Sequence, residues 1–374
     1  MDKKIYPSFT IIVETENLLT TGVDDFQKAL HSLINQDVPL TSAKEVLLLC
    51  GNNISDEISE EIANNYSWIT TVQIPDSLGY YEVKSYGSKI ATGDIVIYAD
   101  LDCQYDSGWL KSLLESFTTN ESIDIVAGET VIAVKNPYSM ALAINYMLHR
   151  QKTQQQLHPS PYPIYYINNV AFKREVLQKY PIPERVPIFR GTCSIHARVL
   201  KKNGYTIWKQ PLAKAAHATP NSLMNYLWRF LLMGHDNYWL DILYDQIKRK
   251  QSSLSGSSYA SKENAILKSN NLTNKFKPKP LHIRLWNKCS YIFRQTKIYL
   301  QDAPHTAIYL PLAIPIIFLS QFLMLLGRLI TKYNSHYLLK TYLDQFEPAY
   351  SETLKFESLP EDAKQFQLKE VICQ

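Results

Sequence analysis

Residues 94–110 read Asp94-Ile-Val-Ile-Tyr-Ala-Asp100-Leu-Asp102-Cys-Gln-Tyr-Asp-Ser-Gly-Trp109-Leu110. The apolar run over 95–99 predicts a buried strand, and the pattern from Trp109 onward predicts a helix. Side chains alternate along a strand, so Asp100 and Asp102 should point the same way. Two such carboxylates at a sheet edge can hold Mg²⁺ or Mn²⁺, and such a cation can neutralise a diphosphate leaving group. The alternative is a pair of exposed turn acids, because Asp-x-Asp is a common tripeptide.

The composition of the whole chain sets broad limits on the class of protein. With 374 residues, of which 45% are hydrophobic and 20% charged, the chain can bury one large domain with extensions, or two domains. A net charge of only +4 argues against a dedicated nucleic-acid binder. Five widely spaced cysteines without a CxxC pair favour free thiols in a reducing compartment. No signal-peptide core follows Met1, so we expect the catalytic part on the cytoplasmic side.

Strands and helices alternate through the first part of the chain. We predict strands at 7–13, 45–50, 68–74 and 95–99, with helices near Phe26, Ser55 and 86–93 between them. This order predicts an α/β fold with a mostly parallel central sheet that helices cover on both faces. Ligands of such sheets bind outside the carboxyl ends of the strands. Three turns should therefore surround one crevice: Glu14–Asn17, Gly51–Asn53 and Asp100–Asp102.

The following segment should complete the same domain. We expect a strand pair over 123–134, a helix and then a loop over 137–163, a strand over 165–172, a helix over 191–203, a strand over 205–208, and then residues 211–217. These predictions place the domain boundary near residue 220.

The C-terminal part has a different character. We expect an aromatic helix and a basic Ser- and Lys-rich linker over 221–304, an apolar helix over 305–331, and a polar tail over 332–374. The charge-free run 307–327 is just long enough to span a bilayer, which takes roughly 20 apolar residues. The run could instead lie in the membrane plane or pack as a buried or dimer helix, because Pro311 and Pro315 would kink it. Lys248-Arg249-Lys250 and the lysines 275, 277 and 279 would suit an anionic membrane surface or a solvated linker.

The order of these pieces resembles the family-2 glycosyltransferases, which have the GT-A fold, over about residues 7–220. The resemblance rests on several motifs in sequence order: the first strand with Asn17, the helix with Ser32-Leu33 and Gln36, Lys84-Ser-Tyr-Gly87, Ala91-Thr-Gly93-Asp94, Asp100-Leu-Asp102, Trp109-Leu110, Asn168-Asn169-Val-Ala-Phe with Arg174, Gly204-Tyr205, and Pro211 to His217. The resemblance implies a nucleotide-sugar donor, a divalent metal (Mn²⁺ or Mg²⁺) and inversion at the anomeric carbon.

The same resemblance implies roles for individual residues. Asp102 would ligate the metal, and Asp100 would contact the ribose or reach the metal through water. Lys84 would lie beside the diphosphate, where a positive charge stabilises developing negative charge. His217 could be a further metal ligand or a phosphate contact, and Trp228-Arg229 could offer a stacking surface and a cation. Each of the last three could also have a purely structural role.

Two departures from the family pattern concern the base-reading acid and the catalytic base. Gly51 or Asn52 stands where the family usually has an aspartate, and Asn52 or Asn53 could still hydrogen-bond a base. Glu14 or Glu16 could contact the base or ribose instead, or be a plain surface acid. Gly191-Thr192-Cys193 replaces the usual Gly followed by an acidic pair, one member of which takes the proton of the acceptor hydroxyl. We consider Glu129 and His196 as alternative bases, since a base must lie within about 2.6–3.2 Å of the proton it removes.

The sequence thus predicts a membrane-associated transferase at the cytoplasmic face of the cell membrane. Its acceptor would be a lipid-linked or surface glycan. The missing acidic pair leaves open a non-catalytic, nucleotide-sugar-binding scaffold of a polysaccharide assembly. A nucleotidyltransferase is the weaker alternative, because the N-terminus lacks a Gly-rich phosphate loop. Oligomeric state stays open.

Overall fold

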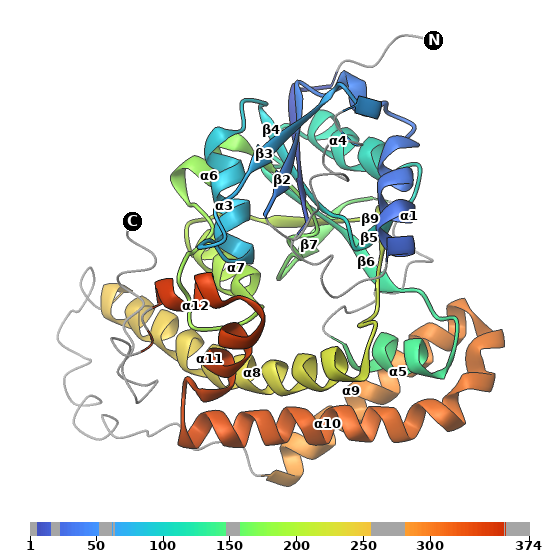
Figure 1. Cartoon of the computed structure of the whole chain (residues 1–374), viewed down its shortest axis with the longest axis vertical. Coiled ribbons are helices and arrows are strands. Elements are labelled where there is room, and N and C mark those ends of the chain that lie inside the picture. Colours follow the sequence, from blue (N-terminus) through green and yellow to red (C-terminus); the bar gives the residue numbers. More distant parts are fainter. Residues whose placement is uncertain are drawn as a thin grey trace, which may run out of the picture.

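The computed structural model describes residues 6–15, 23–51, 62, 64–146, 158–255, 281–354 and 356. A twisted sheet forms the upper part of the molecule, and long helices cross its lower part (Figure 1). Several predictions lie outside the described residues: the roles of Glu16, Asn52 and Asn53, the helix start at Ser55, and the lysines 275, 277 and 279.

The central sheet has the strand order β3-β2-β1-β4-β8-β6-β9-β5, and β7 pairs with β9. Its strands are β1 (Phe9–Glu14), β2 (Glu45–Cys50), β3 (Ile69–Gln73), β4 (Ile95–Asp100), β5 (Cys103–Tyr105), β6 (Ile125–Ile132), β7 (Ser160–Tyr162), β8 (Asn169–Lys173) and β9 (Ile207–His217). The first four are parallel, and β8 is antiparallel to both β4 and β6. The mixed α/β sheet of the GT-A fold is therefore confirmed.

Helices cover both faces of the sheet because the strands carry apolar side chains on each side. One face of β1 and β4 packs on α1 (Val23–Ile34) and α4 (Trp109–Thr119). The other face packs on α3 (Tyr80–Ile90), α6 (Arg174–Lys179) and α7 (Thr192–Lys202). Both β1 and β4 are buried along their whole length, as expected for central strands of a two-sided sheet.

Two predicted elements have different limits in the structure. The helix predicted over 86–93 is α3, which begins at Tyr80 and ends at Ile90. Gly93 is needed for close packing and not for ending the helix, since a Cβ there would lie 2.5 Å from the Phe9 carbonyl carbon. The strand pair predicted over 123–134 is wrong, because this segment forms the single strand β6.

Strand β9 is longer than predicted and carries His217 to the edge of the sheet. It pairs with β6 in parallel, and the register shifts between Gly128 and Glu129. Gly128 pairs with Gln210, whereas Glu129 pairs with Lys214. Beyond this bulge β9 pairs with β5, which sets Cys103 opposite His217. The longer strand thus places a histidine beside the Asp-x-Asp turn.

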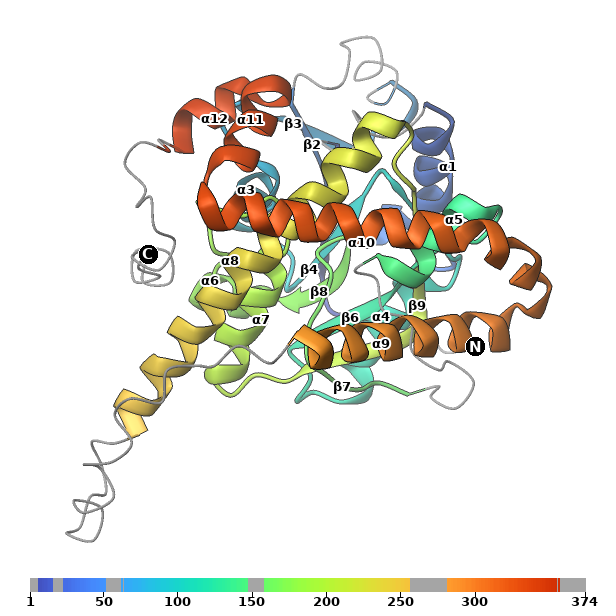
Figure 2. The ribbon, with the colours of Figure 1, turned by 90° about the horizontal axis from the view of Figure 1, so that it is seen from below.

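Helix α5 and the C-terminal part of the chain pack as helices under the sheet domain (Figure 1). These are α5 (Pro137–Asn145), α8 (Leu223–Ser255), α9 (Leu281–Asp302), the 3₁₀ helix η5 (Pro304–Tyr309), α10 (Leu310–Tyr333), α11 (Tyr337–Phe346) and α12 (Pro348–Leu354), and a further 3₁₀ turn, η2 (Leu40–Ser42), lies before β2. Helix α10 runs beneath α8 and α5 (Figures 1 and 2). Gly327 of α10 lies so close to α8 that a Cβ would be 2.0 Å from the Leu231 carbonyl oxygen.

Two expectations for this part of the chain are wrong. Helix α8 continues to Ser255, so Lys248-Arg249-Lys250 belongs to a helix and not to a linker. The segment after residue 332 is more than a polar tail, because α11 and α12 fold back onto the sheet domain. Thr353 Oγ1 donates a hydrogen bond to the Ser77 carbonyl at 3.3 Å, and Tyr350 packs directly against Gly79.

Candidate active site

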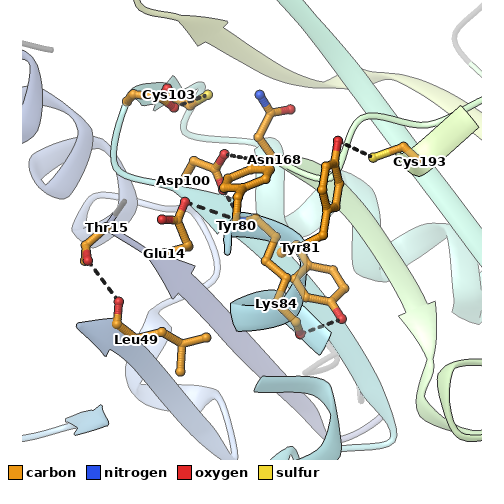
Figure 3. Close-up of polar contacts among 12 residues, drawn as sticks. Glu14, Thr15, Leu49, Tyr80, Tyr81, Lys84, Asp100, Cys103, Asn168 and Cys193 are labelled. Carbon is orange, nitrogen blue, oxygen red and sulfur yellow. Dashed lines mark hydrogen bonds and ion pairs between the residues drawn. The ribbon is translucent and has the colours of Figure 1, made fainter. Parts of the chain in front are cut away.

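The first aspartate of the Asp-x-Asp motif is held by a buried cation. Asp100 ends β4 opposite Glu14, the last residue of β1. Lys84 of α3 forms an ion pair with Asp100 and lies 3.8 Å from Glu14 Oε2. Tyr80 Oη donates to Asp100 Oδ2 at 2.6 Å (Figure 3). Asp100 and Lys84 are fully buried, and burial raises the pKa of Tyr80, with Asp100 adding to the effect, so Tyr80 stays a donor.

This cluster changes the roles expected of its members. Lys84 was predicted to lie beside the diphosphate, but its ammonium group is enclosed between two strand-end carboxylates. The structure therefore places it as the counter-ion that holds Asp100 and Glu14 in position. A contact of Glu14 or Asp100 with the nucleotide-sugar donor remains a prediction. Lys84 would affect that contact by holding these two carboxylates in place.

The second aspartate of the motif faces a histidine. Asp102 Oδ2 lies 3.4 Å from His217 Nε2, and His217 Nδ1 lies 2.6 Å from the Ala218 carbonyl oxygen. A carbonyl oxygen only accepts, so Nδ1 donates to it, and Nε2 is the nitrogen that could offer a lone pair to a metal beside Asp102. Burial raises the pKa of Asp102, while His217 offsets part of this effect. Two lone-pair donors at this separation favour a cation between them.

A divalent metal fits this pair of side chains. The ligand atoms of Asp102, Cys103 and His217 all lie within 4.8 Å of one another. Cys103 Sγ donates to Asp102 Oδ1 at 3.4 Å, and burial raises the pKa of this thiol well above its usual range. The thiol is thus a neutral partner of Asp102, which leaves one carboxylate and one imidazole as protein ligands. Oxygen and imidazole ligands suit Mn²⁺, and a diphosphate can complete such a site.

Two arginines line the approach to the aspartates. Arg229 of α8 is close enough to lower the pKa of Asp102, and its guanidinium carbon lies 5.3 Å from the Phe189 ring centroid. Arg190 stacks over Tyr80, with its guanidinium carbon 4.1 Å from the ring centroid. The sequence predicted Arg229 but not Arg190. Together they give the site the positive charge that a diphosphate requires.

The structure does not support Glu129 as a catalytic base. Glu129 is buried in β6 and forms an ion pair at 2.8 Å with Lys209, which is buried as well. The ammonium group of Lys209 also lies 5.0 Å from the Tyr162 ring centroid. A carboxylate enclosed with its own counter-ion is poorly placed to accept a proton from an acceptor.

His196 is also unsuited to the role of base. Its ring is fully buried in α7, and Tyr165 Oη lies 2.6 Å from Nδ1. Nε2 lies 2.8 Å from the Tyr180 carbonyl oxygen, so both nitrogens are engaged in the core. Burial lowers the pKa of His196 to about 4. We therefore interpret His196 as a structural histidine and do not carry the prediction forward.

Asn169, at the start of β8, joins elements near the site. Asn169 accepts a hydrogen bond from Trp109 Nε1 at 2.8 Å and donates to the Ala213 carbonyl oxygen at 3.0 Å. It thereby ties β8 to α4 and β9, which explains why Trp109 follows the metal motif. Arg174, taken as the basic residue of the acceptor side, lies at the opposite end of β8, where its Nε donates to the Gly93 carbonyl oxygen.

Comparison with known proteins bears on the family resemblance. The model described as Glycosyl transferase family 2 matches residues 20–181. The resemblance predicted from the sequence is thereby confirmed over this segment, which is similar to that family and lies in a sheet with the GT-A fold.

Individual relatives share only parts of the chain. N-acetylgalactosaminyltransferase 6 of Drosophila melanogaster is 28% identical over 98 residues, which are 25% of this chain and 15% of the relative. Polypeptide N-acetylgalactosaminyltransferase 4 of Mus musculus is 26% identical over 135 residues, or 32% and 23% of the two chains. The match thus spans less than a quarter of either relative.

Two solved structures show similarity at low sequence identity. A crystal structure of GalNAc-T7 with UDP, GalNAc and Mn²⁺ matches with a TM-score of 0.45 and 13% identity, covering 57% of this chain and 44% of that one. The mannosyltransferase PcManGT from Pyrobaculum calidifontis, in complex with GDP-Man and Mn²⁺, matches with a TM-score of 0.41 and 15% identity, covering 95% and 88%.

Proposed function

We propose that the chain transfers a sugar from a nucleotide-sugar donor, with a divalent metal and with inversion, to a glycan or lipid-linked acceptor. The observation that supports this most is the pair Asp102 Oδ2 and His217 Nε2, 3.4 Å apart at the carboxyl edge of the sheet. This is the edge where ligands of open α/β sheets bind. The adjacent arginines, Arg229 and Arg190, match the charge of a diphosphate.

Each protein group has a distinct part in this proposal. When bound between Asp102 and His217, Mn²⁺ or Mg²⁺ would neutralise charge that develops on the leaving diphosphate. Arg229 would add a fixed positive charge at the same place. The buried cluster of Lys84, Asp100 and Glu14 would hold the sheet edge rigid, so that little reorganisation is needed during the reaction.

Donor turnover with water as acceptor tests the proposal without knowledge of the natural acceptor. Purified protein would be incubated with Mn²⁺ and a panel of UDP-, GDP- and dTDP-sugars, with UDP-N-acetylgalactosamine first because both curated relatives are N-acetylgalactosaminyltransferases. We expect release of nucleoside diphosphate from one donor and a sugar of opposite anomeric configuration by NMR. Release with retained configuration would refute inversion. Donor binding without any release would favour the non-catalytic scaffold.

We also propose that the protein docks on a membrane through α10. Among the described residues, one helical stretch, Pro304–Tyr333, is long and apolar enough to cross a membrane. One side of it packs on the protein, with buried residues such as Ala313, Met324 and Thr331 spread over its length. The opposite side exposes large apolar side chains: Ile308, Leu312, Ile314, Phe318, Leu319, Phe322, Leu325, Leu326, Leu329 and Tyr333.

This arrangement favours a helix that lies in the membrane plane. A spanning helix would have to leave α8, yet Gly234 and Gly327 let the two backbones touch. In-plane helices bury their apolar side about 5–10 Å deep, at the boundary between headgroups and acyl chains. Figure 2 views the molecule from below and shows α10 extended across it. The catalytic edge would then face acceptors that a membrane presents, which supports the lipid-linked class. We propose the cytoplasmic face of the membrane as its location.

Liposome flotation tests the membrane proposal. Full-length protein should float with vesicles of phosphatidylcholine and phosphatidylglycerol, and the double variant Phe318→Glu with Phe322→Glu should stay at the bottom. Tyr86→Glu on α3, also an exposed aromatic, is the matched control and should float. A double variant that floats equally well would refute docking through α10. A shift from dimer to monomer in that variant, with no flotation of the wild type, would show that the exposed side binds a second copy instead.

A further inference from the structure

The acid that should take the proton of the acceptor is absent from its usual place. Helix α7 begins with Thr192-Cys193 after Gly191, whose φ of 106° suits glycine. Burial raises the pKa of Cys193 to about 11, and its thiol lies 3.6 Å from Tyr81 Oη. Neither side chain can accept a proton near neutral pH. An inverting transfer therefore needs a carboxylate from another part of the chain.

A carboxylate from the C-terminal helices does reach this place. Glu347, between α11 and α12, lines a small cleft together with Thr192, Tyr80, Tyr81 and Arg190. The cleft thus lies between the start of α7 and Tyr80, whose hydroxyl donates a hydrogen bond to Asp100. The other described acid in the lining, Glu82, is engaged with the backbone N–H groups of Gly79 at 3.4 Å and Arg185 at 3.2 Å.

Two arginines lie between Glu347 and the two aspartates in electrostatic terms, because each acts on Glu347 and on a residue of the Asp-x-Asp site. Arg229 acts electrostatically on both Glu347 and Asp102. Arg190 acts on Glu347 and stacks over Tyr80, whose hydroxyl bonds Asp100. Glu347 therefore shares both arginines with the residues around the two aspartates.

We propose that Glu347 is the catalytic base of this transferase and replaces the acid missing at Thr192-Cys193. The inference rests on the proposed function. In the step, the acceptor oxygen bonds to the anomeric carbon while its proton passes to the Glu347 carboxylate. The bond between that carbon and the diphosphate oxygen breaks, and the nucleoside diphosphate leaves with the electron pair. The fold of α11 and α12 onto α3 would thus complete the active site.

The surroundings of Glu347 suit a base that works near neutral pH. Burial raises its pKa, whereas Arg190 and Arg229 lower it and keep the charged form accessible. Other titratable groups of the same cleft come from α3, from the loop before α7 and from α12: Tyr80, Tyr81, Glu82, Arg185 and Tyr350. A base of this kind should produce an acid limb in the pH profile of kcat/KM, above the usual range of a glutamate.

Donor turnover with water as acceptor tests this inference through Glu347→Gln. We expect kcat to fall by ~10²–10⁴-fold and the acid limb of the pH profile to vanish. Donor binding, measured by thermal shift with Mn²⁺, should change less than threefold. Glu347→Asp should keep the acid limb at a reduced rate. Glu352→Gln on α12, an exposed glutamate, is the matched control and should behave as wild type.

The outcomes separate the two proposals. If wild type releases nucleoside diphosphate and Glu347→Gln does so within threefold of it, Glu347 is not the base. Joint loss of turnover and donor binding in Glu347→Gln, with no recovery in Glu347→Asp, would assign it a structural role instead. If wild type neither binds nor turns over any donor, the proposed function itself fails, and this inference fails with it.

Discussion

Replacing Lys84 with methionine should strongly destabilise the protein. Methionine fills most of the same volume but leaves Asp100 and Glu14 charged and buried without their cation. Removing one partner of a buried ion pair costs about 3–5 kcal/mol of unfolding free energy. Urea unfolding followed by circular dichroism in mild detergent would measure the loss at pH 7.5.

Two further variants isolate the buried cluster. Lys89→Met on the same helix removes an exposed ion pair with Glu184 at 2.8 Å and should cost only about 0–1 kcal/mol. Adding Glu14→Gln to Lys84→Met should restore part of the loss, since it removes one of the two stranded charges. The reasoning would be refuted if Lys84→Met were no more destabilising than Lys89→Met.

Three other predictions follow from particular contacts. Burial lowers the pKa of His196 to about 4 from 6.5, so the free energy of unfolding should fall by roughly 3 kcal/mol as the pH falls through that window. In urea unfolding, His196→Gln should abolish this dependence of stability on pH. An unchanged dependence in the variant would contradict the prediction. Gly327→Ala should cost about 1–3 kcal/mol by pushing α10 from α8. Gly108→Ala, whose added Cβ would lie in ordinary contact 3.7 Å from Asp37 Oδ2, should be nearly neutral in the same assay. Arg229→Met should lower donor turnover by ~10²-fold, and equal turnover in this variant and in Arg198→Met would contradict its role.

The sequence predicted the parts of the site that lie close together along the chain. The apolar run before Asp100 fixed the central strand, and the order of strands and helices predicted the GT-A sheet. His217 was also predicted, although the long strand that carries it was not. The predicted strand covered only 205–208, whereas β9 continues through Pro211 to His217. The sheet tolerates this proline where the register between β6 and β9 shifts.

Other residues of the site could not be found in the sequence. Tyr80 and Arg190 gained roles only through contacts across the fold. Glu347 comes from a polar segment with no motif, and only the packing of α11 and α12 brings it to Thr192. Lys84 was recognised as important but assigned to the wrong partner, since helical spacing does not reveal whether a lysine points to solvent or to a strand end. The prediction that Glu129 or His196 is the catalytic base fails for the same reason, because the sequence does not show that each side chain is buried with a partner.

The central claim is that Asp102 and His217 hold a divalent metal for a nucleotide diphosphate. Electron paramagnetic resonance of Mn²⁺ in the presence of UDP or GDP measures this binding directly and without turnover. We expect wild type to bind Mn²⁺, Asp102→Asn and His217→Gln to lose this binding, and Asp106→Asn, an exposed neighbour in the same turn, to keep it. Undiminished Mn²⁺ binding by Asp102→Asn and His217→Gln would contradict the account.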